Sequence, residues 1–252
     1  PERFEEIRKK TSFRDAETER WKDILDRVYL PEDEDLGIFL QQDNYLDKVQ
    51  RTAGDLDKSE RPLNQYWSWD RILRSCFIKQ GDVVQGLYFF EDHFDEDTIR
   101  RNFDFYEPRT VHESSLSPCI HAIIASKLGY SDKAYQLYLR TARLDLDDYN
   151  NEVHQGLHIT SMAGTWMSIV EGFAGKRAKD GELYFNPSLP EEWRAYSFKI
   201  LLRGNRLNIH VESDQVIVSC EKGNESSVNI YGKELTVSPG NEEVVSMPEL
   251  RQ

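Results

Sequence analysis

The stretch Ser117-Pro118-Cys119-Ile120-His121-Ala122-Ile123-Ile124-Ala125-Ser126-Lys127-Leu128-Gly129 decides the fold of this 252-residue chain. Ser is favoured as a helix N-cap and Pro at the first helical position, so we predict that a helix begins at Ser117-Pro118. Gly129 suits its C-terminal end, and Ser131 is predicted to cap a second helix. Apolar residues recur at helical spacing through both, at Ile120, Ile123, Ile124 and Leu128, then Ala134, Leu137, Tyr138 and Ala142. The stretch therefore predicts a helical hairpin.

The same spacing extends outward in both directions. An amphipathic helix is predicted at Asp15–Leu30, with Trp21, Ile24, Leu25 and Val28 on one face. From Ser68 to Tyr88 the helical pattern is interrupted at Lys79-Gln80-Gly81-Asp82, where Asp82 is a predicted N-cap. A short helix is predicted at Glu96–Tyr106, and a longer one at about Thr160–Phe173. Helices that come in pairs, with alternating short turns and long loops, indicate part of an α/α toroid whose long loops open at one end.

After Pro190 the period changes from that of a helix to that of a strand. Apolar and polar residues alternate from about Ser197 to Val245, and turn residues such as Gly204-Asn205 and Gly223-Asn224 separate the runs. Short strands at even spacing indicate a small antiparallel β-sandwich. The predicted class is thus a multidomain α and β protein, with the toroid part at residues 1–185 and the β-sandwich at 186–252.

Composition excludes several functional classes. The net charge of −13 argues against nucleic-acid binding, because a phosphate backbone requires a basic surface. No apolar run reaches the length of a membrane helix. The cysteines Cys76, Cys119 and Cys220 are odd in number and widely spaced, which indicates neither a disulfide framework nor a metal site. We therefore expect no membrane contact, no nucleic-acid partner and no metal, and a reducing cytoplasm fits.

The segment Gln155-Gly156-Leu157-His158-Ile159-Thr160-Ser161 places an imidazole and two hydroxyls at the opening of an apolar helix. The N-terminus of a helix has unpaired N–H groups and partial positive charge, so it suits an anion. On these residues alone, a capping loop with a structural His158 is the better supported interpretation, because capping hydroxyls are common.

Two further segments carry polar groups at predicted helix starts. Lys79-Gln80 supplies an ammonium and an amide, which suit sugar hydroxyls, although on these residues alone an exposed pair at a helix end is the better supported interpretation, because most surface lysines are solvated. His112-Glu113-Ser114-Ser115-Leu116-Ser117 supplies Ser115 as a second hydroxyl and Glu113 as a sugar ligand or second base. A capping loop is again the simpler alternative.

Together these three motifs, in this order and spacing, resemble the C-terminal part of the phosphorylases of glycoside hydrolase family 65, those that act on maltose above all. The resemblance extends from about Phe39 to the C-terminal strands. It implies that His158, Thr160, Ser161 and Ser115 bind phosphate, and that Lys79, Gln80 and Glu113 bind the sugar. It also implies an inverting reaction of maltose and phosphate to β-glucose 1-phosphate and glucose, with phosphate as a substrate and no cofactor.

The resemblance also fits the chemistry. An inverting hydrolase places a carboxylate opposite the leaving group to activate water. A phosphorylase requires neutral or cationic groups there, because a carboxylate would repel phosphate. The family's hydrolases are expected to have a carboxylate where this chain has His158. The identity of this residue therefore favours phosphorolysis.

The chain begins at Pro1 and shows no motif like the family's general-acid glutamate, which lies in the upstream region of family members. We therefore expect no catalytic acid in this chain, a fragment that is inactive alone, and a homodimer for the full-length enzyme. Phosphorolysis of kojibiose, nigerose or trehalose is an alternative that these residues leave open. A non-catalytic carbohydrate-binding or scaffold module is the alternative from another class.

Overall fold

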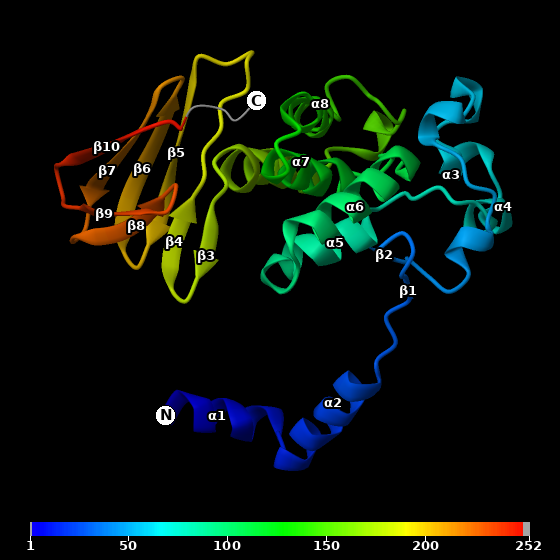
Figure 1. Ribbon diagram of the computed structural model, residues 1–252, viewed down its shortest axis with the longest axis horizontal. Coiled ribbons are helices and arrows are strands. Elements are labelled where there is room, and N and C mark those ends of the chain that lie inside the picture. Colours follow the sequence, from blue (N-terminus) through cyan, green and yellow to red (C-terminus); the bar gives the residue numbers. More distant parts are fainter. Residues whose placement is uncertain (1, 249–252) are drawn as a thin grey trace.

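The computed structural model describes residues 2–248, in which a helical part and a β part pack side by side (Figure 1). A two-residue ribbon, β1 (Glu32–Asp33) with β2 (Ile38–Phe39), lies among the helices. The helices, in chain order, are α1 (Glu2–Thr11), α2 (Asp15–Arg27), α3 (Leu63–Tyr66), α4 (Trp69–Arg74), α5 (Asp82–Phe89), α6 (Glu96–Tyr106), α7 (Ser117–Lys127), α8 (Ser131–Ala142) and α9 (Ile159–Met167). The expected helical architecture followed by a sheet-rich part is confirmed.

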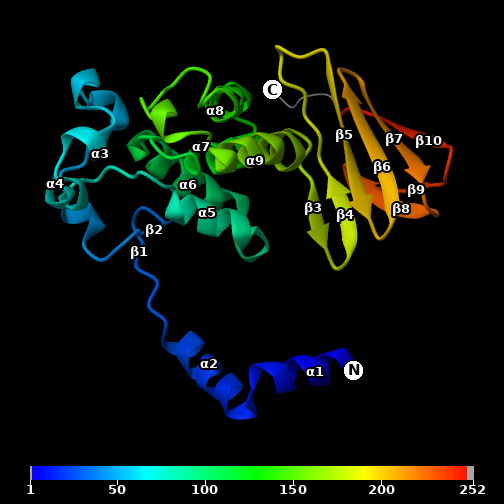
Figure 2. The ribbon, with the colours of Figure 1, turned by 180° about the vertical axis from the view of Figure 1, so that it is seen from behind.

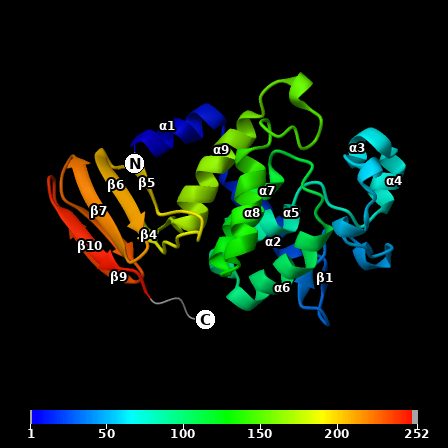
Figure 3. The same cartoon turned by 90° about the horizontal axis from the view of Figure 1, so that it is seen from above.

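Helix α7 is the centre of the helical part, since α5, α8 and α9 all pack against it (Figure 3). Its Ile123, Ile124 and Ala125 are fully buried. The approach of α9 depends on Gly164, because a Cβ there would lie 2.8 Å from the Cβ of Cys119. Close packing of apolar side chains on every face of α7 explains why the Ser117–Gly129 stretch decides the fold.

Three helix starts differ from prediction by one residue. Helices α5, α7 and α8 begin at Asp82, Ser117 and Ser131 themselves, so these residues are the first helical residues and not N-caps. At Ser117 the reason is a competing partner, since its hydroxyl lies 3.0 Å from Nδ1 of His112. Helix α6 begins and ends as predicted, and the side chain of Asp95 caps it by accepting a hydrogen bond from the Thr98 N–H.

Helices α1 and α2 form an arm that projects away from the rest of the molecule (Figures 1 and 2). Helix α2 ends at Arg27, three residues before the predicted end. Its predicted apolar face is present but not buried, since Trp21 is 52% and Leu25 70% exposed. The helix is amphipathic without another described element to pack against.

The β part consists of two four-stranded sheets that enclose a separate apolar core. One sheet has the order β10-β7-β6-β5 and the other β3-β4-β8-β9. Alternate residues such as Leu207, Ile209 and Val211 face inward and are fully buried, as the period of two predicts. The strands are β3 (Arg177–Lys179), β4 (Glu182–Phe185), β5 (Ala195–Leu202), β6 (Asn205–Glu212), β7 (Gln215–Lys222), β8 (Ser226–Ile230), β9 (Lys233–Val237) and β10 (Glu242–Ser246).

One pair of strands departs from the expected antiparallel arrangement, because β4 and β8 run parallel. The two strands are distant in sequence, so a hairpin does not constrain their direction. Both β3 and β4 precede residue 186 and belong to the sheet of β8 and β9. The division into domains at residues 185 and 186 stays a prediction.

The joint between the two parts is aromatic and charged. Trp193 packs edge-on against Tyr138 of α8 and against Phe173, with ring centroids 5.2 Å apart in both pairs. Glu91 is 8% exposed and pairs with Lys127 of α7 and with Arg177 of β3. These contacts place Trp193 at the interface between the two parts, whereas Trp166 is 48% exposed.

A π turn at Ser168–Phe173 continues α9 into this joint. Val170 packs in the core of the β part, while Phe173 packs in the core of the helical part. In a regular α-helix residues three apart lie on one face, so the wider turn is what directs the two side chains into different cores. Among residues 2–248, none of the helices is long and apolar enough to cross a membrane.

Candidate functional site

The segments that precede α5, α7 and α9 meet at one end of the helical part. The N–H of Ile78 donates to the carbonyl of Arg109, and the N–H of Val111 donates back to Ile78. The hydroxyls of Ser115 and Thr160 lie 2.6 Å apart. Helix starts and their partial positive charge therefore converge where the sequence motifs lie, as the toroid arrangement predicts.

Lys79 and Gln80 lie at this end, just before α5, and both are exposed. The amide of Gln80 donates to the hydroxyl of Ser114, with Nε2 and Oγ 3.3 Å apart. The pair therefore presents to the solvent, beside the Ser114-Ser115 segment, the Lys79 ammonium and the Gln80 amide, one N–H of which is already bonded to Ser114.

A buried pair of histidines lies under this pair of residues. His121 is fully buried, and its ring packs edge-on against that of His112 with centroids 4.8 Å apart. Burial lowers the pKa of His121 to about 3 and lowers the pKa of His112 well below its ordinary value. Both rings are therefore neutral near pH 7. A Cβ at Gly81 would lie 2.3 Å from Nε2 of His121, so only glycine fits between Gln80 and the ring.

His158 precedes α9 and is held by a carboxylate that the sequence motifs did not identify. Nδ1 of His158 lies 2.6 Å from Asp145, whose other oxygen accepts a hydrogen bond from the His158 backbone N–H. Burial opposes ionisation of Asp145, but these hydrogen bonds outweigh it and hold the pKa of the carboxyl below its usual range. The Nε2 atom lies 4.0 Å from Glu152. Two carboxylates therefore flank the imidazole, and Asp145 fixes the orientation of its ring.

The two hydroxyls at the start of α9 have different surroundings. Thr160 is exposed and shares its hydrogen bond with Ser115, so these two hydroxyls stand together. Ser161 is 3% exposed, and its hydroxyl donates to the carbonyl of Thr141 in α8. The structure thus brings Ser115 and Thr160 together, while Ser161 faces α8.

Glu113 lies behind the Ser114-Ser115 segment and has both oxygens occupied. Oε1 accepts from Nε of Arg61 at 2.9 Å, and Oε2 accepts from the backbone N–H of Leu63 at 2.7 Å. Glu113 is 3% exposed. Its carboxylate therefore anchors the segment from below and is turned toward Arg61.

Two arginines hold this segment from the same side. Arg61 also donates to the carbonyl of Val111, and Arg140 of α8 donates twice to the carbonyl of His112, at 3.1 and 2.8 Å. His112 has a left-handed φ of 53°, which is unfavourable for a side chain of its size, and the Arg140 hydrogen bonds stabilise it. Sequence motifs do not reveal these arginines, because their partners lie far away in the chain.

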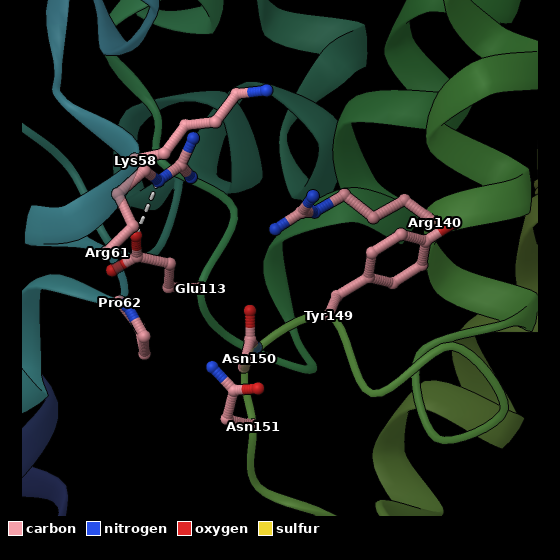
Figure 4. A pocket seen from close by; sticks show the side chains of 8 residues that line it. All are labelled: Lys58, Arg61, Pro62, Glu113, Arg140, Tyr149, Asn150 and Asn151. Carbon is pink, nitrogen blue, oxygen red and sulfur yellow. Dashed lines mark hydrogen bonds and ion pairs between the residues drawn. The ribbon is translucent and has the colours of Figure 1, made fainter.

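A cavity of about 260 Å³ opens between the two arginines (Figure 4). We call it the arginine cavity. Its walls come from the segment before α3, from Glu113, from α8 and from the loop before α9, through Lys58, Arg61, Pro62, Glu113, Arg140, Tyr149, Asn150 and Asn151.

Chemically, the exposed end offers hydrogen-bond donors and little negative charge that is not already paired. An ammonium, an amide, two hydroxyls and an imidazole lie on three adjacent segments, from Lys79, Gln80, Ser115, Thr160 and His158. Such donors suit sugar hydroxyls and an oxyanion. Within residues 2–248 there is no cluster of side chains that could hold a metal ion.

Comparison with known proteins gives consistent matches. Residues 1–167 match the central catalytic domain of glycosyl hydrolase family 65, and residues 177–237 match the C-terminal domain of that family. The chain is 52% identical over 226 residues to a maltose phosphorylase of Bacillus subtilis, which covers 90% of this chain and 30% of that protein.

More distant relatives act on other disaccharides. An α,α-trehalose phosphorylase of Thermoanaerobacter brockii is 37% identical over 95% of this chain and 31% of that protein, and a kojibiose phosphorylase of the same organism is 35% identical over 94% and 31%. A solved structure, described as a candidate kojibiose phosphorylase from the human microbiome, superposes with a TM-score of 0.86 at 35% identity, over 96% of this chain and 33% of that one. The chain spans about a third of the length of these relatives.

Proposed function

The chain belongs to glycosyl hydrolase family 65, and from this premise we propose that the protein carrying it is an inverting phosphorylase of α-glucosyl disaccharides, with maltose as its substrate. It would convert maltose and phosphate to β-glucose 1-phosphate and glucose. The observation that best supports phosphorolysis is the His158–Asp145 pair at the start of α9. An imidazole there does not repel phosphate as a carboxylate would, whereas a hydrolase would need a free carboxylate to activate water.

The other residues of the site have roles that follow from their surroundings. Ser115 and Thr160 share one hydrogen bond, so each can turn its hydroxyl to a phosphate oxygen. We propose that Lys79 and Gln80 bind hydroxyls of the transferred glucosyl ring. Ser161 and Glu113, which face α8 and Arg61, would act on the ligands through the segments that they hold.

The reaction also requires a group that protonates the leaving oxygen. We assign this general acid to none of the residues of this chain. Phosphate would attack the anomeric carbon from the face opposite that acid, which inverts the configuration. The donors on the three helix starts would stabilise the charge that develops on phosphate and sugar as the bond breaks.

Maltose is proposed as the substrate because the relative that acts on it is 52% identical, whereas the trehalose and kojibiose relatives are 37% and 35% identical. We propose a cytoplasmic location, which the three unpaired, buried cysteines suit. The homodimer and the absence of a cofactor stay predictions.

The test is turnover by the full-length protein with maltose, kojibiose, nigerose and trehalose, each with and without phosphate. We expect glucose release from maltose that depends on phosphate, with the β anomer of glucose 1-phosphate detected first by NMR. Release without phosphate would show a hydrolase, and preference for another disaccharide would overturn the substrate assignment.

A further inference from the structure

Apart from Glu113, the residues assigned to phosphate and sugar do not line the arginine cavity. None of Lys79, Ser115, His158 or Thr160 lines it. It shares with the candidate site only the segment at Glu113, whose carboxylate faces the cavity side (Figure 4). The cavity therefore needs its own explanation.

The charges around the cavity do not balance. Three cations line it, Lys58, Arg61 and Arg140, against one carboxylate. Glu113 is paired with Arg61. Within residues 2–248, Arg140 has a neutral carbonyl as hydrogen-bond acceptor and the ring of Tyr149 at 5.1 Å, but no carboxylate in an ion pair.

The excess of positive charge is unfavourable above all for the guanidinium of Arg140. Burial, with repulsion from Arg61, lowers the pKa of Arg140 below its ordinary value. A partly buried guanidinium is normally paired with an anion, because removing the charge from water is otherwise unfavourable. Lys58, at the rim, also has no ion-pair partner within the described part of the chain.

Asn150 adds a second, independent observation. It is 4% exposed, and its side-chain amide makes no hydrogen bond to the described residues. Figure 4 shows this side chain pointing into the space between Glu113 and Arg140 with its amide oxygen foremost. A half-turn of the amide group would present its NH2 group, a donor, to the same space. The residue is largely buried but its amide is reached from the cavity, so the amide is available to a ligand there.

We propose that the arginine cavity binds a phosphate oxyanion, either inorganic phosphate or the phosphate group of a sugar phosphate. Arg61, Arg140 and Lys58 supply the charge, and the amide of Asn150 supplies a neutral donor. The volume of about 260 Å³ is that of about nine water molecules at about 30 Å³ each, which exceeds the needs of free phosphate. The ring of Tyr149 forms a wall for the rest of a larger ligand.

Such a ligand would act on the candidate site through the backbone. Arg61 and Arg140 hold the carbonyls of Val111 and His112, which directly precede Glu113 and the Ser114-Ser115 segment. An anion that pairs with both guanidinium groups fixes their positions, and with them this segment.

The test uses isothermal titration of the full-length protein with inorganic phosphate and, separately, with glucose 6-phosphate. The protein carries His158→Glu, so that the proposed phosphate subsite of the reaction is disabled. We expect one site for at least one probe at low ionic strength, and the probe that binds more tightly identifies the source of the phosphate.

Lys58→Glu is the diagnostic variant, because this exposed side chain makes no hydrogen bond that folding needs. Reversal of its charge should weaken binding by about tenfold or more, since unit charges a few ångströms apart interact strongly near a protein surface. Lys233→Glu on β9, also exposed, is the matched control and should leave affinity unchanged. Absence of binding by both probes, or equal affinity in the two lysine variants, would overturn the proposal. Because the candidate subsite is already disabled, either result leaves the proposed reaction untouched.

Discussion

At the scale of the residue, His158 is the side chain on which the proposed reaction depends most. Asp145 pairs with its Nδ1, and its Nε2 lies 4.0 Å from Glu152. We expect His158→Ala to raise the KM for phosphate far more than the KM for maltose, because the substitution removes a side chain that is proposed to bind phosphate and not the sugar. Steady-state kinetics with each substrate varied in turn measures the difference. His154→Ala, an exposed histidine in the same loop, should change neither constant.

His158→Glu is the sharper change at the same position. A carboxylate would repel phosphate and could instead activate water, as the base of an inverting hydrolase does. We expect phosphorolysis to be lost and slow hydrolysis of maltose to be gained. A variant that still used phosphate with its normal KM would place the phosphate subsite elsewhere.

Gln80 tests the sugar side of the site. A neutral hydrogen bond contributes about 0.5–1.5 kcal/mol, and more when its loss leaves a buried group unpaired. Gln80→Ala should therefore lower kcat/KM for maltose by about tenfold to a hundredfold, which corresponds to that energy or its double. Normal kinetics in both Gln80→Ala and Lys79→Ala would mean that the pair does not bind the sugar.

At the scale of the element, Gly81 sets how closely the start of α5 approaches α7. A methyl group there would press on Nε2 of His121, and overpacking of this kind costs about 1–3 kcal/mol. We expect Gly81→Ala to lower the free energy of unfolding by that amount in urea titrations. Gly86→Ala, in the same helix, meets no atom within 4 Å and should instead stabilise it by up to about 1 kcal/mol, since Ala favours a helix over Gly. Equal effects would show that contact with His121 does not set the spacing.

The His112–His121 pair under α5 makes stability depend on pH. Below about pH 6.5 these two histidines become protonated in the unfolded chain but stay neutral in the folded protein, because burial lowers their pKa. The free energy of unfolding therefore falls as pH falls. Each histidine should contribute a slope of up to about 1.4 kcal/mol per pH unit between about pH 5 and 6.5. Urea titrations at several pH values should show a shallower slope for His121→Asn than for the parent. An unchanged slope would mean that the ring is protonated in the folded state.

How far the elements and the site follow from sequence depends on where the partners of each residue lie. Periodicity located α6, α7 and β5 because their own residues carry the apolar pattern. The N-cap role of Ser117 was wrong because His112, on the preceding loop, takes the hydroxyl. The Asp145–His158 pair, and the arginines behind Glu113, join segments that only folding brings together. Local patterns therefore could not reveal them.

At the scale of the whole molecule, large apolar side chains lie exposed on the helices that carry the site. On α9 Ile159 is 66%, Met162 46% and Trp166 48% exposed, and after α5 Phe90 is 60% exposed. Apolar surface of this extent normally contacts another surface. The chain also spans about a third of the length of its relatives.

We expect the 252-residue chain alone to associate and to show no maltose phosphorolysis. Light scattering during size-exclusion chromatography measures the association, and a glucose assay with phosphate measures turnover. The full-length protein is the positive control for the assay. Robust phosphorolysis by the chain alone would mean that it contains the general acid after all.

The π turn at Ser168–Phe173 fixes how the two ends of the last helical segment, residues 159–173, are rotated about its axis relative to each other. At one end Thr160 lies beside Ser115, and at the other Val170 and Phe173 pack in two different cores. Each residue of an α-helix advances the rotation by about 100°. Deleting one residue from the turn would therefore rotate one end against the other, so that Thr160 could not stay beside Ser115 while Val170 and Phe173 kept their places in the two cores. The number of residues in the turn, rather than the identity of any one of them, therefore sets the rotation that lets both ends of the segment keep their contacts.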